Sequence, residues 1–410
     1  MQNTVVAVNI KPRDRTAAFI VGFAGWTLDA FDFFLVVFSL TAIGHTFGKT
    51  DAKIALALTV TLAFRPLGSI LFGLLADRIG RRVPLMLNLV LFAVVEIMTG
   101  LAQSFVWFLI IRSIFGIVMG GQWGLGTSLA MEKVPPRIRG LLSGLLQQGY
   151  AIGYLLAALA YYLMFDHYSW RPLFFLGAIP ALLAAAFVAL RVEESAVWKQ
   201  TRKQSWSALG HTLTSNWKLF LYITIFMMTM HMTSHGTQDM YPTFLQRQWG
   251  LIPRQRAALS ALAMFGAVLG GTLIGFLSDK LGRRRAMIIA ISGALLVVPL
   301  WAFGRSLPSL VLGAFIMQFM VQGAWGVVPA HLSEMSPDSI RGFLPGFGYQ
   351  CGVLLASVVV YVEAAFAQHT SYPVAMAGTA GVVLVLAAVM TLLGNERRAT
   401  VFGVGQDATD

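Results

Sequence analysis

Long apolar segments recur along the whole chain, each bounded by charged residues or by clusters of proline and glycine. A helix needs roughly 20 residues to cross the hydrocarbon core of a membrane. Segments of about that length predict twelve membrane-spanning helices, at 17–43, 52–76, 83–103, 105–131, 141–164, 171–190, 218–243, 256–277, 284–303, 308–333, 342–366 and 372–394. The first segment is too long for the apolar part of a signal peptide, so we expect it to remain as a span.

One long polar connection interrupts this pattern. Residues 191–217 are rich in Lys, Arg, Gln, Ser and Trp and follow the sixth predicted span. They predict an N-terminal six-helix half at 1–190, a linker, and a C-terminal six-helix half at 218–410 that ends in a short tail.

An internal repeat supports this division. Residues 73–82 read Gly-x-x-x-Asp-Arg-x-Gly-Arg-Arg, and residues 275–284 repeat the pattern 202 positions later with Lys in place of the first Arg. The same offset joins Trp123 to Trp325, Glu132 to Glu334, Arg139 to Arg341 and Gln148 to Gln350. One offset near half the chain length predicts two similar halves, related by an axis along the membrane normal.

The composition agrees with a membrane protein. Of the residues, 57% are hydrophobic and 12% charged, whereas an ordinary soluble domain is about half apolar and about a quarter charged. The mean hydropathy is +0.71. These values argue against a soluble protein and favour one that crosses the membrane many times.

The positive net charge of +12 would suggest a nucleic-acid partner in a soluble protein. Here the basic residues gather in alternate connections, such as 78–82, 133–139 and 280–285, and are scarce in the others. An excess of Lys and Arg marks the cytoplasmic side of a membrane protein. We therefore expect a multi-pass protein of the cell (inner) membrane with both termini and the linker in the cytoplasm, with the lipid bilayer and no nucleic acid as partner.

The twelve spans and the repeated loop resemble the major facilitator superfamily over essentially the whole chain. The resemblance implies an all-α membrane protein and a secondary transporter that alternates between inward-open and outward-open states around a central site. It further implies cytoplasmic latches, made by Asp77, Arg81, Glu132, Arg139, Asp279, Arg283, Glu334 and Arg341. Opposite charges at facing helix ends can pair in one state and separate in the other. The alternative is that the basic loops serve only as topology signals.

Two carboxylates lie inside the first predicted span. Ionisable groups at the bilayer centre cost at least ~2.5–3.5 kcal/mol each on insertion scales, so each is a candidate for function. Asp29 and Asp32 stand three residues apart and therefore share one helical face. Two carboxylates in a low-dielectric site oppose each other's ionisation, which predicts a reversible proton carrier. A structural ion pair with a neighbouring arginine is the alternative.

The seventh predicted span carries a polar stripe. His231, His235 and Asp239 recur every four residues, with Gln238 and Thr243 beside them. Gly236 and Pro242 loosen the helix and free backbone groups that must face protein or a watery cavity. This stripe predicts a substrate or proton site; lone histidines would more often be packing residues.

Two arginines, Arg65 and Arg112, lie inside the second and fourth predicted spans. A guanidinium is always charged and binds carboxylates with two hydrogen bonds, so either residue is a candidate receptor for a small organic anion. Alternatively, one of them neutralises Asp29 or Asp32. Glu96 and Glu363 have no obvious partner, and both structural and functional roles stay open for them.

Within the superfamily, two segments resemble the sialate/lactate proton symporter family. Residues 25–33 read Gly-Trp-x-Leu-Asp-Ala-Phe-Asp-Phe, and residues 234–243 are similar to the signature of its monocarboxylate permeases. His231 departs from that signature, which has Asn, and Gln122 stands where many relatives carry Glu. The second departure places more weight on the first span for the proton.

These observations predict proton-coupled symport of a small monocarboxylate, lactate or pyruvate, with a small organic anion and a proton as the transported partners. We expect Arg65, Arg112, His231, His235, Gln238 and Thr243 to bind substrate, and Asp29, Asp32 and Asp239 to couple the proton. A symporter for sialic acid or an aromatic acid is the alternative, and a carboxylate receptor is a remote one. We expect no enzyme, no cofactor and no metal, because metal-ligand spacings, nucleotide loops and nucleophile elbows are missing from the sequence. We expect the monomer to function.

Overall fold

The computed structural model describes residues 12–49, 51–164, 169–200 and 206–402, and these residues are helical apart from short connections and the segment 394–402. The first helices are α1 (Pro12–Phe47), α2 (Asp51–Ile79), α3 (Arg82–Leu101), α4 (Phe105–Lys133), the short 3-10 helix η1 (Pro136–Ile138), α5 (Arg139–Gln147), α6 (Gly149–Met164) and α7 (Arg171–Arg191). Two short helices follow, α8 (Ala196–Gln200) and α9 (Trp206–Ser215). The remaining helices are α10 (Trp217–Gln238), α11 (Tyr241–Trp249), α12 (Pro253–Leu281), α13 (Arg283–Phe303), α14 (Leu307–Met335), α15 (Leu344–Ala356), α16 (Val358–His369) and α17 (Tyr372–Leu393). Lipid offers no hydrogen-bond partners to the backbone, so apolar segments fold as helices that satisfy their own N–H and C=O groups.

Ten segments of the described chain are long and apolar enough to cross a membrane. The predicted span 141–164 is not among them, because the helix breaks at Gln148 into α5 and α6. The predicted span 218–243 is not among them either: α10 ends at Gln238 and a separate helix, α11, begins at Tyr241. The polar stripe also lowers the hydropathy of α10. The predicted span 342–366 bends at Ser357, where α15 gives way to α16.

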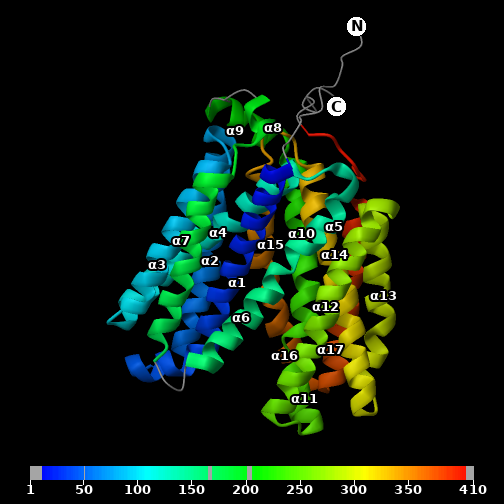
Figure 1. Ribbon diagram of the computed structural model, residues 1–410. Helices are drawn as coiled ribbons and strands as arrows, with labels where there is room; N and C mark the ends of the chain where they lie inside the picture. Colours follow the sequence, from blue (N-terminus) through cyan, green and yellow to red (C-terminus); the bar gives the residue numbers. More distant parts are fainter. Residues whose placement is uncertain (1–11, 50, 165–168, 201–205, 403–410) are drawn as a thin grey trace.

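The hydrophobic packing follows the order of the chain. One buried cluster is built from residues between Ala17 and Val192, and a second one mainly from residues between Ile223 and Ala387. We refer to α1–α7 as the N-terminal half and to α10–α17 as the C-terminal half, a division that stays a proposal drawn from the sequence repeat. The two sets of helices lie side by side in Figure 1.

Two helices leave their own set and pack against the other one. α5 contacts α12 and α14, and α15 contacts α2 and α4 (Figure 1). Close approach at one crossing depends on glycine: a Cβ on Gly124 would lie 3.0 Å from the Cα of Gly346. Each half therefore contributes a helix to the contact with its neighbour.

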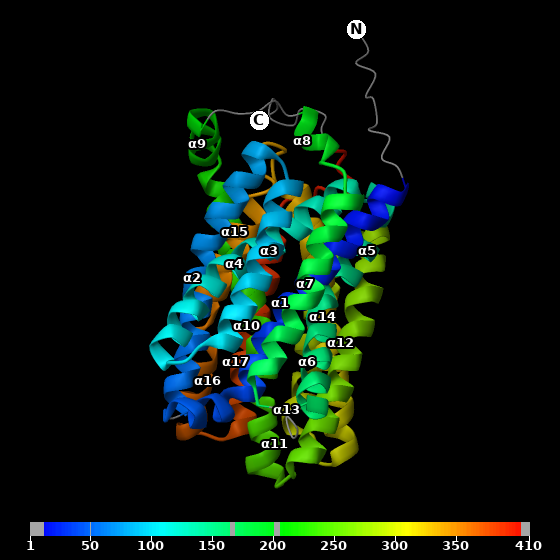
Figure 2. The same ribbon diagram turned by 60° about the vertical axis from the view of Figure 1, so that its left-hand side comes forward.

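We call one end of the bundle the linker end: there α1 begins, α7 ends and α8 and α9 lie, as Figures 1 and 2 show. The last described residue, Phe402, is also at this end, against Arg139. The predicted cytoplasmic positions of the two termini concern residues 1–11 and 403–410, which lie outside the described residues, as do linker residues 201–205. That the linker end faces the cytoplasm stays a proposal.

Helix starts at the opposite end repeat between the halves. The hydroxyl of Ser104 accepts a hydrogen bond from the N–H of Trp107 at the start of α4, at 3.2 Å. Ser306, 202 positions later, accepts from Ser309 at the start of α14, at 3.4 Å. These serines are the N-cap residues of the two helices, and each satisfies one of the free N–H groups of the first turn.

Candidate functional site

A small cavity lies between the halves, in the middle of the bundle. Its volume is about 110 Å³, and its walls come from α1, α2, α4, α5, α6, α10, α14 and α15. Pockets for drug-sized ligands hold roughly 300–1,000 Å³. The cavity thus has room for a small molecule, and its polar lining includes Arg65, His231, His235 and Gln238.

Arg65 brings a positive charge to this cavity. Only 5% of the residue is exposed, and its Nε and Nη2 atoms have no hydrogen-bond partner among the described residues. Pro66 follows it inside α2. A buried guanidinium with unused donors is costly unless an acceptor reaches it, so this wall of the cavity is suited to an anion.

Arg112 is committed elsewhere. Its Nη1 donates to Oδ1 of Asp32 at 2.9 Å and its Nη2 to Oδ2 at 2.5 Å. Both side chains are fully buried, and the guanidinium lies 4.1 Å from the ring centre of Phe115. Arg112 does not line the cavity. The structure therefore places this arginine in the ion pair that the sequence left as the alternative role.

Asp29 lies one turn before Asp32 on α1 and is also fully buried. Neither of its carboxylate oxygens has a hydrogen-bond partner among the described residues. The charge of Arg65 acts on it. Among the described residues Asp29 is thus left without a hydrogen-bonded cation, while Asp32 is held by Arg112.

The polar stripe of α10 is divided by the structure. His231, His235 and Gln238 line the cavity. Asp239 does not line the cavity, but its Oδ2 atom lies 2.9 Å from Nδ1 of His235. This contact orients the imidazole of His235. Thr243 belongs to α11 and does not line the cavity, since the helix ends at Gln238.

The hydrogen bonds that the cavity residues already make determine which donor and acceptor atoms remain free for a ligand. Nδ1 of His231 lies 2.8 Å from the carbonyl of Met227, which fixes that nitrogen as a donor and leaves Nε2 as an acceptor. Nε2 has no partner among the described residues. The amide of Gln238 donates to Oε1 of Gln318 at 2.6 Å.

Aromatic side chains form much of the remaining wall, and the sequence reasoning missed this. Trp26 stacks on Tyr150 with ring centres 5.8 Å apart, and the ring of Tyr349 lies 6.0 Å from both Trp26 and Trp325. All four residues line the cavity. The repeat of Trp123 at Trp325 and the position of Tyr349 beside repeated Gln350 were the available signals.

The latch carboxylates bind helix starts of the opposite half. Oδ1 and Oδ2 of Asp77 accept from the backbone N–H groups of Gly342 and Phe343 at 2.8 and 2.9 Å. Asp279 accepts from those of Gly140 and Leu141 at the same two distances. Free N–H groups and the helix dipole favour an anion at these positions. For Asp77 and Asp279, the partners across the halves are backbone amides, not the guanidiniums that the sequence suggested.

The arginines of the repeated loop pair within their own halves. Arg81 binds Asp77 at 3.0 Å and Glu132 at 3.2 Å. Arg283 binds Asp279 at 2.8 Å and Glu334 at 2.9 Å. Each arginine thus joins the latch carboxylate to a second carboxylate at the end of α4 or α14.

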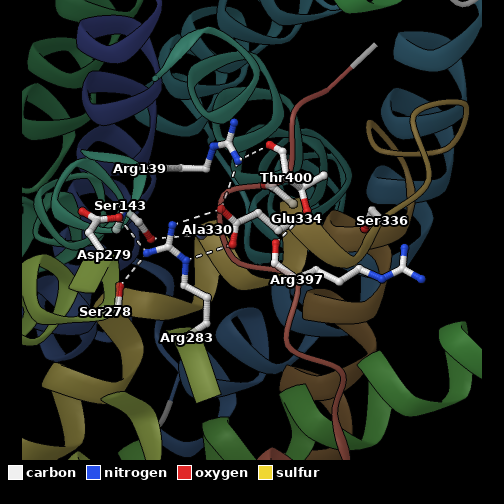
Figure 3. Close-up of polar contacts among 12 residues, drawn as sticks. Arg139, Ser143, Ser278, Asp279, Arg283, Ala330, Glu334, Ser336, Arg397 and Thr400 are labelled. Carbon is white, nitrogen blue, oxygen red and sulfur yellow. Dashed lines mark hydrogen bonds and ion pairs between the residues drawn. The ribbon is translucent and has the colours of Figure 1, made fainter. Parts of the chain in front are cut away.

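One ion pair crosses between the halves here. Nη1 of Arg139 lies 3.0 Å from Oε1 of Glu334, and Figure 3 shows Arg139 and Arg283 on either side of this carboxylate. Burial lowers the pKa of the Arg139 guanidinium to about 10, with Glu334 opposing that shift. The Arg139 guanidinium is therefore still charged at neutral pH.

The repeat partner of Arg139 behaves differently. Arg341 donates to the carbonyls of Ser333 and Ser336 at 3.0 and 2.9 Å and pairs with Asp338 of its own half. It does not pair with Glu132, which accepts a hydrogen bond from the hydroxyl of Ser195. The symmetry of the repeat is broken at this position.

The linker and the C-terminal segment add polar contacts that the sequence reasoning missed. Glu194 accepts from the N–H of Arg81 at 2.8 Å, and Glu396 accepts from that of Arg283 at 3.1 Å. These two glutamates stand 202 positions apart, so a wider search for the repeat could have found them. Gly80 has φ +106°, and a Cβ there would come within 2.1 Å of Glu194.

Phe402 closes the linker end from the C-terminal side. Its ring lies 3.9 Å from the guanidinium carbon of Arg139 and 3.8 Å from that of Arg341. The carbonyl of Thr400 accepts from Nη1 of Arg139 at 2.9 Å. The segment 399–402 therefore bridges an arginine of each half.

A bundle of membrane-crossing helices around a small central cavity, with charged contacts at one end, is an architecture typical of secondary transporters. The sequence comparison agrees: the chain matches the profile of the Major Facilitator Superfamily over residues 17–251 and 237–407. The chain belongs to this superfamily, which confirms the predicted all-α fold class.

Three similar proteins illustrate the relationship. A "Carboxylic acid transporter protein homolog" of Saccharomyces cerevisiae is 28% identical over 383 residues, 87% of this chain, although the match spans only 61% of that protein. The "Cis,cis-muconate transport protein" of Acinetobacter baylyi is 28% identical over 352 residues, covering 83% of this chain and 85% of the relative. Among solved structures, the proton:xylose symporter XylE bound to 6-bromo-6-deoxy-D-glucose superposes with a TM-score of 0.78 at 19% identity, covering 95% of this chain and 98% of XylE.

Proposed function

We propose that the protein carries a small monocarboxylate, lactate or pyruvate, across the membrane together with a proton. The observation that carries this proposal is Arg65, whose buried guanidinium keeps unused donors at the wall of a cavity of about 110 Å³. The relatives named for carboxylic acids and muconate support an organic acid as the substrate class.

In this proposal the substrate carboxylate binds Arg65, since a guanidinium and a carboxylate fit each other with two hydrogen bonds. His235 and Gln238 on the facing wall hydrogen-bond the 2-hydroxyl or keto oxygen. His235 is oriented for this by Asp239. Arg112 is left out of substrate binding because Asp32 already occupies it.

We propose that the transported proton binds Asp29, for an electrostatic reason. Asp29 has no hydrogen-bond partner among the described residues and faces the charge of Arg65. An anion at Arg65 competes with Asp29 for that charge, and a proton on Asp29 removes the competition. The neutral combination then crosses the low-dielectric barrier at lower electrostatic cost than the anion alone. In this proposal the latches at Asp77 and Asp279 hold the linker end closed in the state that the structure shows. In the other state of the transport cycle these latches come apart and the linker end is open.

The aromatic walls favour one alternative substrate. Trp26, Tyr150, Trp325 and Tyr349 could stack on the ring of an aromatic acid. A symporter for such an acid would use the same arginine, so the difference between the two candidates lies in substrate shape.

Uptake into proteoliposomes of the purified full chain tests the proposal. With an acidic exterior, we expect labelled lactate to accumulate above the level in empty liposomes, and unlabelled lactate and pyruvate to compete. Competition by benzoate but not by pyruvate would favour the aromatic acid. Failure of lactate and pyruvate to compete with any transported acid would contradict the monocarboxylate proposal.

A further inference from the structure

Gln318 is a buried glutamine of α14 that no sequence motif marked. Only 3% of the residue is exposed, and it does not line the cavity. Its Oε1 atom accepts a hydrogen bond from Nε2 of Gln238 at 2.6 Å. Its own Nε2 donates to the carbonyl and to the hydroxyl oxygen of Thr237, both at 3.3 Å. Gln318 therefore connects α14 to a cavity residue at the end of α10.

The direction of these hydrogen bonds is set by backbone carbonyls. A carbonyl oxygen only accepts, so the atom of Gln318 that faces the carbonyl of Thr237 is the amide nitrogen. The hydroxyl of Thr237 donates to the carbonyl of Thr233 at 2.8 Å, and its oxygen is left to accept from Gln318. Oε1 of Gln318 then faces Gln238, which must present its NH₂ group.

Gln238 is thereby turned so that its oxygen stays available. The residue lines the cavity, its NH₂ group faces Gln318, and its Oε1 has no hydrogen bond among the described residues. The carbonyl of Thr237 can receive Gln318 because it belongs to the last turn of α10, where carbonyls lack partners within the helix. The end of α10 thus determines that Gln238 offers an acceptor.

His231 offers a second acceptor from the same helix. Its Nδ1 donates to the carbonyl of Met227, and its Nε2 has no partner among the described residues. The rings of Trp325 and Tyr349 stand edge-on to the imidazole, with ring centres 4.7 and 4.6 Å away, and hold its orientation. In the part of the chain that the structure describes, no carboxylate hydrogen-bonds this ring, which favours its neutral form and keeps Nε2 an acceptor.

The cavity therefore combines donors from α2 with acceptors from α10. A substrate carboxylate satisfies the unused donors of Arg65. A keto oxygen is a further acceptor and leaves Gln238 and His231 unpaired, whereas a hydroxyl group donates to either of them. His235 does not distinguish the two groups, because a hydroxyl oxygen accepts a hydrogen bond as a keto oxygen does. The lining thus matches an acid that also carries a hydroxyl.

We propose that the cavity selects hydroxy acids over the matching oxo acids, and that Gln318 is the positioning residue that makes Gln238 an acceptor. This rests on the proposed function, because it takes a carboxylate bound at Arg65 as its starting point. Lactate pairs with both sets of groups, and pyruvate pairs with the donors alone. One hydrogen bond between neutral groups corresponds to a preference of about tenfold, so pyruvate still competes when it is in excess.

Competition against uptake of labelled lactate measures this preference as the ratio of the inhibition constants of pyruvate and lactate. We expect a ratio of about ten for the wild type in proteoliposomes. Gln318→Met keeps an unbranched side chain but removes the amide, so Gln238 can turn and the ratio should fall close to one. Gln350→Leu changes another fully buried glutamine outside the cavity lining and, as the matched control, should keep the ratio. A wild-type ratio in Gln318→Met would overturn the positioning role.

A double-variant cycle shows whether Gln318 acts through Gln238. Gln238→Met should lower the ratio by itself, and Gln318→Met added to it should change the ratio no further. A further fall in the double variant would show that Gln318 acts by another route and would refute its role as a positioning residue. If Gln318→Met does not fold, Gln238→Met alone still tests the acceptor, and an unchanged ratio in that variant would contradict the proposal.

Mandelate and phenylglyoxylate, the matching pair of aromatic acids, separate this proposal from the identity of the substrate. If the protein carries an aromatic acid, mandelate should compete about tenfold better than phenylglyoxylate; the hydroxy-acid preference then holds although lactate is not the substrate. Equal competition within a pair that the protein transports would refute the preference and leave the proposed function standing. Lack of competition by all four acids would refute both.

Discussion

Arg139 of α5 and Glu334 of α14 join the two halves through a buried ion pair of 3.0 Å. Glu334 also binds Arg283 of its own half, at 2.9 and 3.0 Å. If the linker end opens as proposed, Glu334 loses Arg139 but keeps Arg283. A buried carboxylate that keeps one partner avoids the full penalty of an unpaired charge, so this contact can break and re-form during a transport cycle.

Removing the charge of a latch carboxylate should favour opening of the linker end. In Asp77→Asn, the two backbone N–H groups of Gly342 and Phe343 lose a charged acceptor, and hydrogen bonds to charged groups contribute roughly 1.5–3 kcal/mol each. Spin labels on the exposed residues Arg137 and Arg285, in a Cys351→Ser background, would report the distance between the halves. We expect a larger fraction of long distances.

Asp279→Asn should act in the same direction, because it serves the other half in the same geometry. Arg305→Gln removes an exposed charge at the opposite end of the bundle and is the control. Unchanged distance distributions in both aspartate variants would contradict the latch role.

Arg65→Lys should weaken substrate binding by roughly 10–100-fold, because lysine offers one point charge where the guanidinium offers paired donors. Trp26 and Trp325 line the cavity, so tryptophan fluorescence can follow titration with the acid. The melting temperature should change little. Wild-type affinity in this variant would exclude Arg65 as the carboxylate receptor.

Arg112→Leu should lower the stability of the fold. The shape of the cavity should change little, because Arg112 does not line it. The substitution leaves Asp32 buried without its cation, and breaking a buried pair in this way costs about 3–5 kcal/mol. We expect a markedly lower melting temperature in detergent. The same loss of stability should be smaller in Arg112→Leu combined with Asp32→Asn, because the uncompensated charge is then gone.

Phe402→Ala should loosen the closed linker end. The buried ring contacts the guanidiniums of Arg139 and Arg341, and two such contacts contribute at least about 1–2 kcal/mol in all, since each contributes about 0.5–1 kcal/mol even at an exposed site. That corresponds to a roughly 5–30-fold change in the open-to-closed ratio, measured with the same spin labels. Phe402→Trp keeps an aromatic face and should retain the closed state; equal behaviour of the two variants would argue against the contact.

Some features could be predicted from the sequence because they depend on local spacing. The period of α10 places His231 and His235 on one face, and both reach the cavity. The offset that relates Asp77 to Asp279 anticipates two latches of the same geometry. These relationships need only the helix period or a comparison of the chain with itself.

Other features depend on which helices become neighbours. In the sequence, Arg65 and Arg112 are both single arginines inside apolar segments. Only the packing of α1 against α4 shows that Arg112 is the one that pairs with Asp32. The break at Gln148 has no proline to signal it. Its physical setting is the packing of α5 against α12 and α14, away from α6.

In each half, a carboxylate binds the start of a helix that belongs to the other half. This reciprocal contact limits which parts of the chain can be replaced. Asp77 accepts hydrogen bonds from the backbone N–H groups of residues 342–343, and Asp279 accepts them from those of residues 140–141. A chimera that replaced one half by that of a relative would change both contacts at once, each on one side only. Successful chimeras should therefore transfer α5 together with Asp279, and α15 together with Asp77. The unit that can be exchanged between relatives is then each helix start with its carboxylate, and not a whole half.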